Sequence, residues 1–156
     1  MATKIRPYHP FDKMAVLELG KQMHAEAPRY QNKLFDEGRA GAAIDGIAGA
    51  GAVFVAEDDG KLVGMIGGMV SPEFFSTEKV AYAICHYVAP AARKGLAGFR
   101  LLKAFEAWAF GPGGADESVV APSTGVETDA VVGMYERAGY KIYAHSLVKR
   151  KPDVRS

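Results

Sequence analysis

The chain has 156 residues, of which 49% are hydrophobic and 24% are charged, so we expect one folded domain over residues 1–156 rather than a disordered or fibrous protein. Nineteen Lys and Arg against eighteen Asp and Glu leave a formal net charge of +1, which argues against a dedicated nucleic-acid-binding protein. Cys85 is the single cysteine, which excludes an internal disulfide and a zinc site built on several thiolates. We therefore expect no metal and no nucleic-acid partner.

Targeting signals are not evident in the sequence. Residues 1–10 contain no apolar run of the kind that a signal peptide needs, and no stretch of about 18 apolar residues indicates a membrane span. We expect a cytoplasmic protein with no membrane partner.

Hydrophobic spacing alternates along the chain between the period of helices and that of strands. The sequence predicts, in chain order, a strand at 4–8, helices at 10–27 and 32 to about 47, strands at 52–56, 62–70 and 79–88, a helix at 101–109, a strand at 118–121, a helix at 131–138 and a strand at 140–148. Residues 58–61, Asp-Asp-Gly-Lys, are typical of a hairpin turn. Early hairpins followed by a late strand–helix–strand crossover predict an α+β fold, with helices covering a mixed sheet.

The most informative segment is residues 88–98, which join a predicted strand to the helix with the clearest amphipathic stripe. The start of a helix presents backbone N–H groups without intrahelical acceptors and the positive end of the helix dipole, which suits an anion. Arg93 and Lys94 add cationic side chains, and Gly95 and Gly98 permit close approach to the backbone. Two interpretations remain open here: a pyrophosphate cradle, or an ordinary turn with two solvated basic residues.

This segment resembles the central motif of the GNAT superfamily of acyl-CoA-dependent N-acyltransferases, V-x-P-x-x-R-G-x-G-x-G/A at the end of the fourth strand. Val88, Pro90, Arg93 and Gly98 match in register, and paired leucines follow at residues 101–102. The resemblance implies a mixed, mostly antiparallel central sheet of about six or seven strands flanked by helices. It also implies direct transfer of an acetyl group from acetyl-CoA, as co-substrate, to an amine.

A second likeness lies at the carboxyl end, where residues 134–140 read Met-Tyr-Glu-Arg-Ala-Gly-Tyr against the family pattern N-x-x-A-x-x-L-Y-x-x-x-G-F. The match is incomplete, because Thr128 replaces the usual Asn. In the phosphate signature Q/R-x-x-G-x-G/A, Leu96 takes the middle glycine, and a shift by one residue leaves Ala92 where Arg or Gln is expected. These departures keep a second hypothesis open, in which the chain is a catalytically silent acyl-CoA-binding or regulatory module. A third and weaker interpretation is a plain α+β domain without affinity for CoA.

The resemblance assigns the coenzyme to eight residues at the end of the central strand and in the following turn. They are Tyr87, Val88, Arg93, Lys94, Gly95, Leu96, Ala97 and Gly98. Backbone groups near Tyr87 and Val88 are expected to pair with the pantetheine amide, and an N–H near Val88 to stabilise the tetrahedral oxyanion.

Two residues are candidates for catalysis. Tyr135 stands where the family keeps a tyrosine for the departing thiolate, although its helical spacing also fits a core aromatic residue. His86 lies on the central strand and could relay a proton or be a structural residue.

The acceptor is expected to be a small-molecule or peptide amine, and a homodimer is possible. The candidate residues for binding the acceptor amine are His24, Glu26, Arg29, Tyr30 and Glu73. Glu26 and Glu73 are also candidates for the general base.

Overall fold

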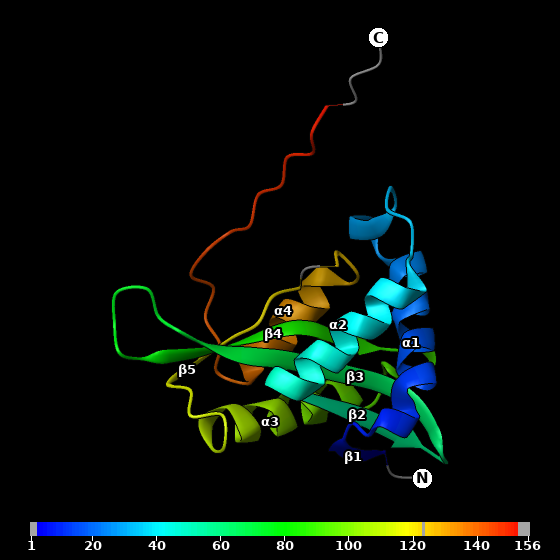
Figure 1. Ribbon diagram of the computed structural model, residues 1–156, viewed down its shortest axis with the longest axis horizontal. Helices are drawn as coiled ribbons and strands as arrows, with labels where there is room; N and C mark the ends of the chain where they lie inside the picture. The colour runs from blue at the N-terminus through cyan, green and yellow to red at the C-terminus, as the bar shows by residue number, and fades with distance from the viewer. Residues whose placement is uncertain (1–2, 123, 153–156) are drawn as a thin grey trace.

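The computed structural model describes residues 3–122 and 124–152 (Figure 1). Its strands and α-helices are β1 (Lys4–Pro7), α1 (Lys13–Glu26), α2 (Glu37–Ala50), β2 (Ala52–Asp58), β3 (Lys61–Pro72), β4 (Lys79–Val88), α3 (Ala97–Phe110), β5 (Glu117–Val119) and α4 (Thr128–Arg137). In this part of the chain, no helix is long and apolar enough to cross a membrane.

The five strands form one sheet in the order β1-β2-β3-β4-β5. Pairs from β1 to β4 are antiparallel and β4–β5 is parallel, which confirms the predicted mixed, mostly antiparallel sheet. The hairpin predicted between β2 and β3 is also present, with positive φ at Asp59 (49°) and Gly60 (79°), as a tight turn between twisted strands requires. In Figure 1, α1 and α2 cover one face of the sheet and α3 lies on the other.

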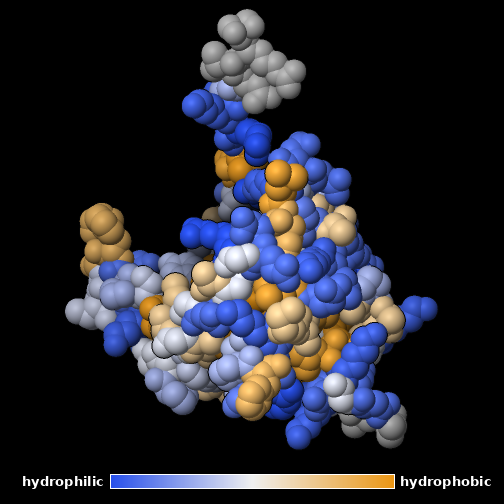
Figure 2. Space-filling model, turned by 45° about the vertical axis from the view of Figure 1, so that its right-hand side comes forward, coloured by the Kyte–Doolittle hydropathy of each residue, from blue (hydrophilic) through white to orange (hydrophobic). Residues whose placement is uncertain are grey.

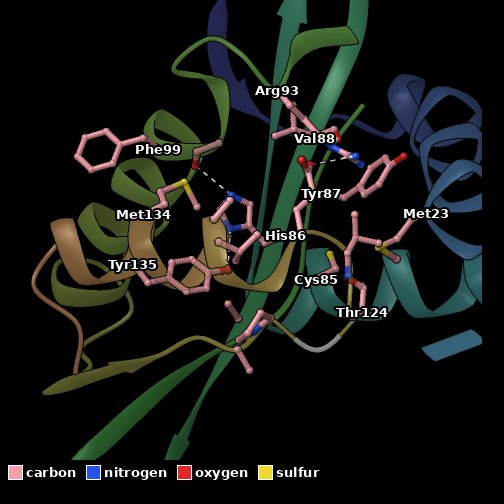
Figure 3. A pocket seen from close by; sticks show the side chains of 18 of the residues that line it. Met23, Cys85, His86, Tyr87, Val88, Arg93, Phe99, Thr124, Met134 and Tyr135 are labelled. Atoms are coloured by element: carbon pink, nitrogen blue, oxygen red, sulfur yellow. Dashed lines mark hydrogen bonds and ion pairs between the residues drawn. The ribbon is translucent and has the colours of Figure 1, made fainter. Parts of the chain in front are cut away.

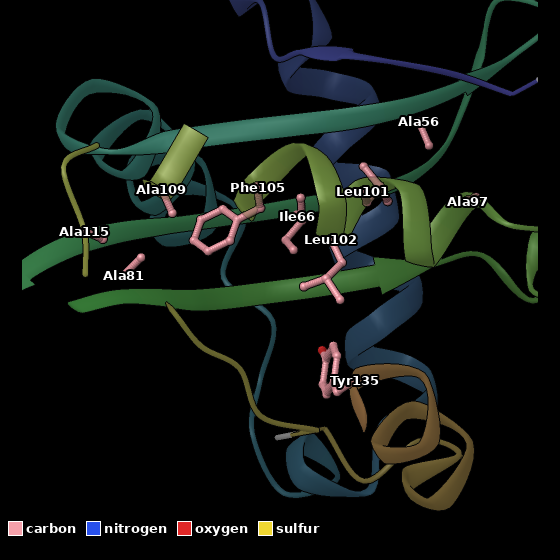
Figure 4. Packing of buried hydrophobic residues seen from close by; sticks show 10 residues of the cluster. All are labelled: Ala56, Ile66, Ala81, Ala97, Leu101, Leu102, Phe105, Ala109, Ala115 and Tyr135. Atoms are coloured by element: carbon pink, nitrogen blue, oxygen red, sulfur yellow. The ribbon is translucent and has the colours of Figure 1, made fainter. Parts of the chain in front are cut away.

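Successive side chains of each strand point to opposite faces of the sheet, so the core consists of one cluster on each face. Ile66 of β3 packs with Leu101, Leu102 and Phe105 of α3, all four with no exposed surface (Figure 4). The next residue back, Met65, belongs to the opposite cluster, which the α1 side chains complete. The amphipathic stripe of α3 thus holds the start of this helix against the end of β4, where the candidate site lies.

The prediction of a strand at residues 140–148 is wrong. After α4 the chain turns at Gly139 (φ 97°) and residues 140–152 form no regular structure, extending away from the sheet (Figure 1). Ile142 and Leu147 are 65% and 94% exposed. A strand needs a neighbouring strand to pair its backbone groups, and none of the five strands of the described chain pairs with this segment. Within residues 3–122 and 124–152, the sheet therefore has five strands rather than the six or seven expected.

The second helix begins at Glu37 rather than at residue 32, and it ends at Ala50 rather than near residue 47. Asp36 explains its start, because its carboxylate accepts a hydrogen bond from the backbone N–H of Arg39 and so caps the helix. The residues before it form a short 3₁₀ turn, Pro28–Tyr30, and a loop.

We predict that Gly68→Ala destabilises the fold by about 3 kcal/mol. A Cβ at Gly68 would overlap the carbonyl oxygen of Tyr82 and lie 2.8 Å from the ring of Phe105, and neither neighbour has room to move. Gly46→Ala is the matched control, because a Cβ there meets nothing within 4 Å in the middle of α2. This control is expected to gain up to about 1 kcal/mol. Urea denaturation measures both; equal stabilities would contradict the packing described for Gly68.

Candidate active site

A cavity of about 530 Å³ lies along the free edge of β4 (Figure 3). Parallel pairing with β5 covers only residues 80–82 of β4, and beyond Val119 the chain leaves the sheet towards α4. Residues 83–88 therefore have no neighbouring strand on this side within the described ranges. The wall of the cavity comes from β4, from the turn before α3 and the start of that helix, and from residues 121–122 and 124–137, together with Met23 and Tyr30.

His86 links two elements that meet at this cavity. Its Nδ1 lies 3.0 Å from the hydroxyl of Tyr135 on α4, and its Nε2 lies 2.9 Å from the carbonyl oxygen of Gly98 at the start of α3 (Figure 3). Burial lowers the pKa of His86 to about 4, so the ring is neutral at physiological pH. Burial also raises the pKa of Tyr135 well above its ordinary value, which keeps the phenol protonated.

Most of the Arg93 guanidinium is engaged in hydrogen bonds to other residues of the protein. Nε donates to the carbonyl oxygen of Val88 at 2.9 Å, and the two terminal nitrogens each donate to the carboxylate of Glu26, at the end of α1, at 2.5 Å. A weaker contact of 3.3 Å reaches Glu127. The hydroxyl of Tyr87 donates to the same Glu26 carboxylate at 3.0 Å. Hydrogen bonding from Arg93 lowers the pKa of Glu26, so this carboxylate stays ionised.

The turn before α3 is open to solvent. Helix α3 begins at Ala97 without any side-chain cap, so the N–H groups of its first turn lack intrahelical acceptors. Leu96, the departure from the family's glycine, has φ −99°, an ordinary value for a leucine, and its side chain is 70% exposed. The Lys94 side chain is also exposed, whereas Ala97 is buried in the core.

The acetyltransferase (GNAT) family model matches residues 18–140, a range that includes β4, the turn, α3 and α4. The chain belongs to the GNAT acetyltransferase family. Members of this family are N-acetyltransferases that use acetyl-CoA. Among curated proteins, none matches the sequence significantly.

Solved structures share the fold of this acetyltransferase. The aminoglycoside N-acetyltransferase AAC(6′)-Iy, solved with a CoA-linked acetylneamine bisubstrate analogue, is 19% identical, with a TM-score of 0.76 over 98% of this chain and 100% of that one. Ribosomal-protein-alanine N-acetyltransferase from Brucella melitensis biovar Abortus is 21% identical, with a TM-score of 0.74 over 97% and 100%. Glucosamine-6-phosphate N-acetyltransferase from Arabidopsis thaliana is 18% identical, with a TM-score of 0.73 over 96% and 99%.

Most of the residues predicted to hold the coenzyme of this GNAT acetyltransferase lie together at the cavity. Those that line it are Tyr87, Val88, Arg93, Gly95, Leu96 and Gly98, together with the two catalytic candidates His86 and Tyr135. Lys94, in the turn before α3, and Ala97, the first residue of α3, do not line the cavity. Tyr135 is both a core residue, only 5% exposed, and a cavity residue, so the two roles considered for it are compatible.

The predicted acceptor residues are more scattered. Only Tyr30 lines the cavity, and the ring of His24 stacks on it with 5.7 Å between centroids. Glu26 is engaged by Arg93, and Arg29 is exposed on the 3₁₀ turn. Glu73 lies at the start of the β3–β4 loop and does not line the cavity. Phe74 and Phe75 of that loop are exposed. The loop itself extends to the left in Figure 1, and Figure 2 shows an apolar projection on the left of its view.

Several cavity residues were missed by the sequence analysis. They include Met23, Ile84, Cys85, Thr124, Glu127 and Met134. The parallel order of β4 and β5 was a usable signal for Thr124 and Glu127, because segments that follow parallel strands leave the sheet at the same edge. Burial raises the pKa of Cys85 to about 11, so its thiol is protonated at neutral pH. In the described ranges, no three His, Cys, Asp or Glu side chains are grouped so that they would hold a metal ion.

Proposed function

We propose that this protein transfers the acetyl group of acetyl-CoA directly to the nitrogen of a small-molecule or peptide amine while both substrates are bound. The observation that carries the proposal is the position of Tyr135, which is buried on α4 and lines the same cavity as the turn before α3. One cavity thus offers an anion-binding turn at one place and a polar hydrogen-bond donor at another.

The coenzyme would bind between the turn and the free edge of β4. The uncapped first turn of α3 suits its diphosphate, and residues 83–88 offer backbone groups to the pantetheine amides. The carbonyl oxygen of Val88 is already occupied by Arg93, so other backbone groups of this edge would make that contact. The charge of Arg93 is likewise neutralised by Glu26, which leaves the exposed Lys94 as the cation better suited to the phosphates.

The reaction needs positioning more than covalent catalysis. A neutral amine attacks the thioester carbon, the new C–N bond forms, and a tetrahedral oxyanion results. Collapse of this intermediate breaks the C–S bond and releases an amide and a thiolate, while the proton of the attacking nitrogen passes to the thiolate or to water. Because the thiol of Cys85 stays protonated, an acetyl-cysteine intermediate is disfavoured.

Tyr135 would stabilise the leaving thiolate by a hydrogen bond rather than by giving up its proton. A thiol has an ordinary pKa of about 8.5, whereas burial raises the pKa of Tyr135 above the ordinary 10. Complete transfer of the Tyr135 proton to the thiolate would therefore be unfavourable in free energy. A hydrogen bond from the O–H group to the developing negative charge nevertheless lowers the barrier. Glu26 is a poor general base, because its pKa is lowered by Arg93, and Nδ1 of His86 is occupied by Tyr135.

Calorimetric titration tests coenzyme binding, with acetyl-CoA and free CoA as ligands. Lys94→Glu is expected to weaken both affinities roughly 10- to 100-fold, because a charge-assisted contact to phosphate becomes a repulsion. Lys79→Glu is the matched control, since it makes the same charge change at the other end of β4. Equal affinities of the Lys94→Glu and Lys79→Glu variants would contradict the assigned phosphate site, and a flat wild-type titration would overturn the function.

Turnover is tested by mass spectrometry of acetyl-CoA reactions with a panel of amines that includes aminoglycosides, hexosamine phosphates, polyamines and peptides. Acetylation of at least one amine is expected. Coenzyme binding without acetylation of any amine would instead support the catalytically silent acyl-CoA-binding module. The ordinary backbone angle of Leu96 removes one reason to expect that alternative.

A further inference from the structure

The two hydrogen bonds of His86 determine where its ring hydrogen lies. A carbonyl oxygen can only accept a hydrogen bond, so Nε2, at 2.9 Å from the carbonyl oxygen of Gly98, must carry the hydrogen. In a neutral imidazole the other nitrogen is then a bare acceptor. The hydroxyl of Tyr135, 3.0 Å from Nδ1, must therefore be the donor of the second bond.

We infer that His86 is a positioning residue, which holds the Tyr135 hydroxyl with its hydrogen directed at Nδ1 and ties that hydroxyl to the first turn of α3 through the Gly98 carbonyl. The three groups come from three different elements, β4, α4 and α3. Figure 3 shows the imidazole between Tyr135 on one side and the start of α3 on the other.

This arrangement has a chemical consequence for the proposed reaction, on which the inference rests. The single hydroxyl hydrogen of Tyr135 can point either at Nδ1 or at the sulfur of the coenzyme. Beside an uncharged thioester it stays on Nδ1, whereas a hydrogen bond to a developing thiolate is the stronger of the two. The interaction with sulfur thus forms mainly as the C–S bond breaks, when it lowers the barrier instead of stabilising the bound substrate.

The arrangement also joins the catalytic group to the coenzyme site. Gly98 belongs to the turn whose amides we assign to the diphosphate, and its carbonyl fixes the plane of the His86 ring. A displacement of this turn would move the acceptor of the Tyr135 hydroxyl as well. We therefore expect the orientation of Tyr135 to depend on the integrity of this turn.

Two substitutions of His86 separate positioning from proton transfer. His86→Gln offers an amide that can donate to the Gly98 carbonyl and accept from Tyr135, yet it does not take up a proton near neutral pH. His86→Leu keeps an apolar side chain and loses both bonds. With the best amine of the panel, we expect His86→Leu to lower kcat about 10-fold or more, with a smaller change in KM for acetyl-CoA, and His86→Gln to recover most of that loss.

A double-mutant cycle tests whether His86 acts through Tyr135. The His86→Leu/Tyr135→Phe double variant is expected to be no slower than Tyr135→Phe alone, within about twofold. Additive losses would overturn the inference, as would a His86→Gln variant as slow as His86→Leu, which would make the imidazole a proton carrier. Full activity of His86→Leu would also overturn it.

The ring hydrogen itself can be observed without any activity. A long-range ¹H–¹⁵N correlation spectrum of the ¹⁵N-labelled wild-type protein at neutral pH, assigned by the signals lost in His86→Gln, is expected to show Nε2 protonated and Nδ1 bare. A protonated Nδ1 would overturn the inference. This measurement stands if His86→Leu fails to fold, and it remains decisive for the histidine if the wild-type protein acetylates no amine and the proposed function fails.

Discussion

Replacing Tyr135 by phenylalanine is expected to lower kcat roughly 100-fold while the affinity for acetyl-CoA is retained. The substitution removes one oxygen atom from a residue that lines the cavity and keeps the ring that packs in the core cluster. The lost hydrogen bond is one that we assign to the developing thiolate, so the loss should fall on the chemical step and not on coenzyme binding. Steady-state kinetics and calorimetric titration of the same preparation measure the two quantities.

Tyr140→Phe is the matched control for this prediction. The Tyr140 ring lies 5.9 Å from that of Tyr135, but its hydroxyl pairs with Ser118 at 2.9 Å and does not line the cavity. Its kcat should stay close to that of the wild type. Tyr135→Phe also leaves Nδ1 of His86 without a donor, which costs about 1–3 kcal/mol of stability, so the assay must be run well below the melting temperature. Equal rates for the two variants would remove Tyr135 from the mechanism.

The second large effect is a loss of stability in mild acid that depends on His86. The pKa of the ring is about 4 in the folded protein and 6.5 when unperturbed. Between these values the unfolded chain binds a proton that the folded protein does not, so the free energy of unfolding falls as the pH falls from 6.5 towards 4. From pH 7.5 to pH 5 the expected loss from this one group is about 2 kcal/mol, or roughly 4–8 °C in Tm.

His86→Gln isolates this contribution, because glutamine does not titrate. The variant is expected to lose about 2 kcal/mol less than the wild type between pH 7.5 and pH 5, measured by urea denaturation at each pH. Glu26 and Asp12, whose pKa values are lowered by Arg93 and Arg6, stabilise the fold above their unfolded pKa values, and this stabilisation is lost only in more acidic solution. Identical pH dependence in the two proteins would contradict the lowered pKa of the His86 imidazole.

The elements that carry a strong local signal were predicted close to their observed bounds. The hairpin between β2 and β3, the strand β4 up to Val88 and the amphipathic helix α3 all follow from short-range patterns. The prediction of the last strand was wrong because strand formation there depends on partners that are remote in the sequence. Residues 140–148 contain apolar and β-branched residues suited to a strand, but a strand also needs an edge to pair with, and no pattern within the segment specifies one.

In the candidate site, too, the features set by local motifs were predicted, and the contacts between remote residues were not. Tyr135 and the turn at residues 93–98 were found from the two motifs, because their spacing is local. The role first expected for Arg93 depended on its charge alone, whereas its partner Glu26 lies 67 residues away on α1 and neutralises that charge. Likewise, nothing near His86 in the sequence shows that Tyr135 and Gly98 lie on either side of its ring.

By itself, the sequence determined the type and order of most elements, the family resemblance and the position of the turn that we assign to the phosphates, because helix period, turn residues and motif spacing act within a few residues of one another. Only the tertiary structure decided which charges are neutralised, which groups lie within hydrogen-bond distance of the His86 ring, and which strand edge is left open. These properties depend on distances of about 3 Å between groups that are remote in the chain, and such distances are set by how the helices pack on the sheet.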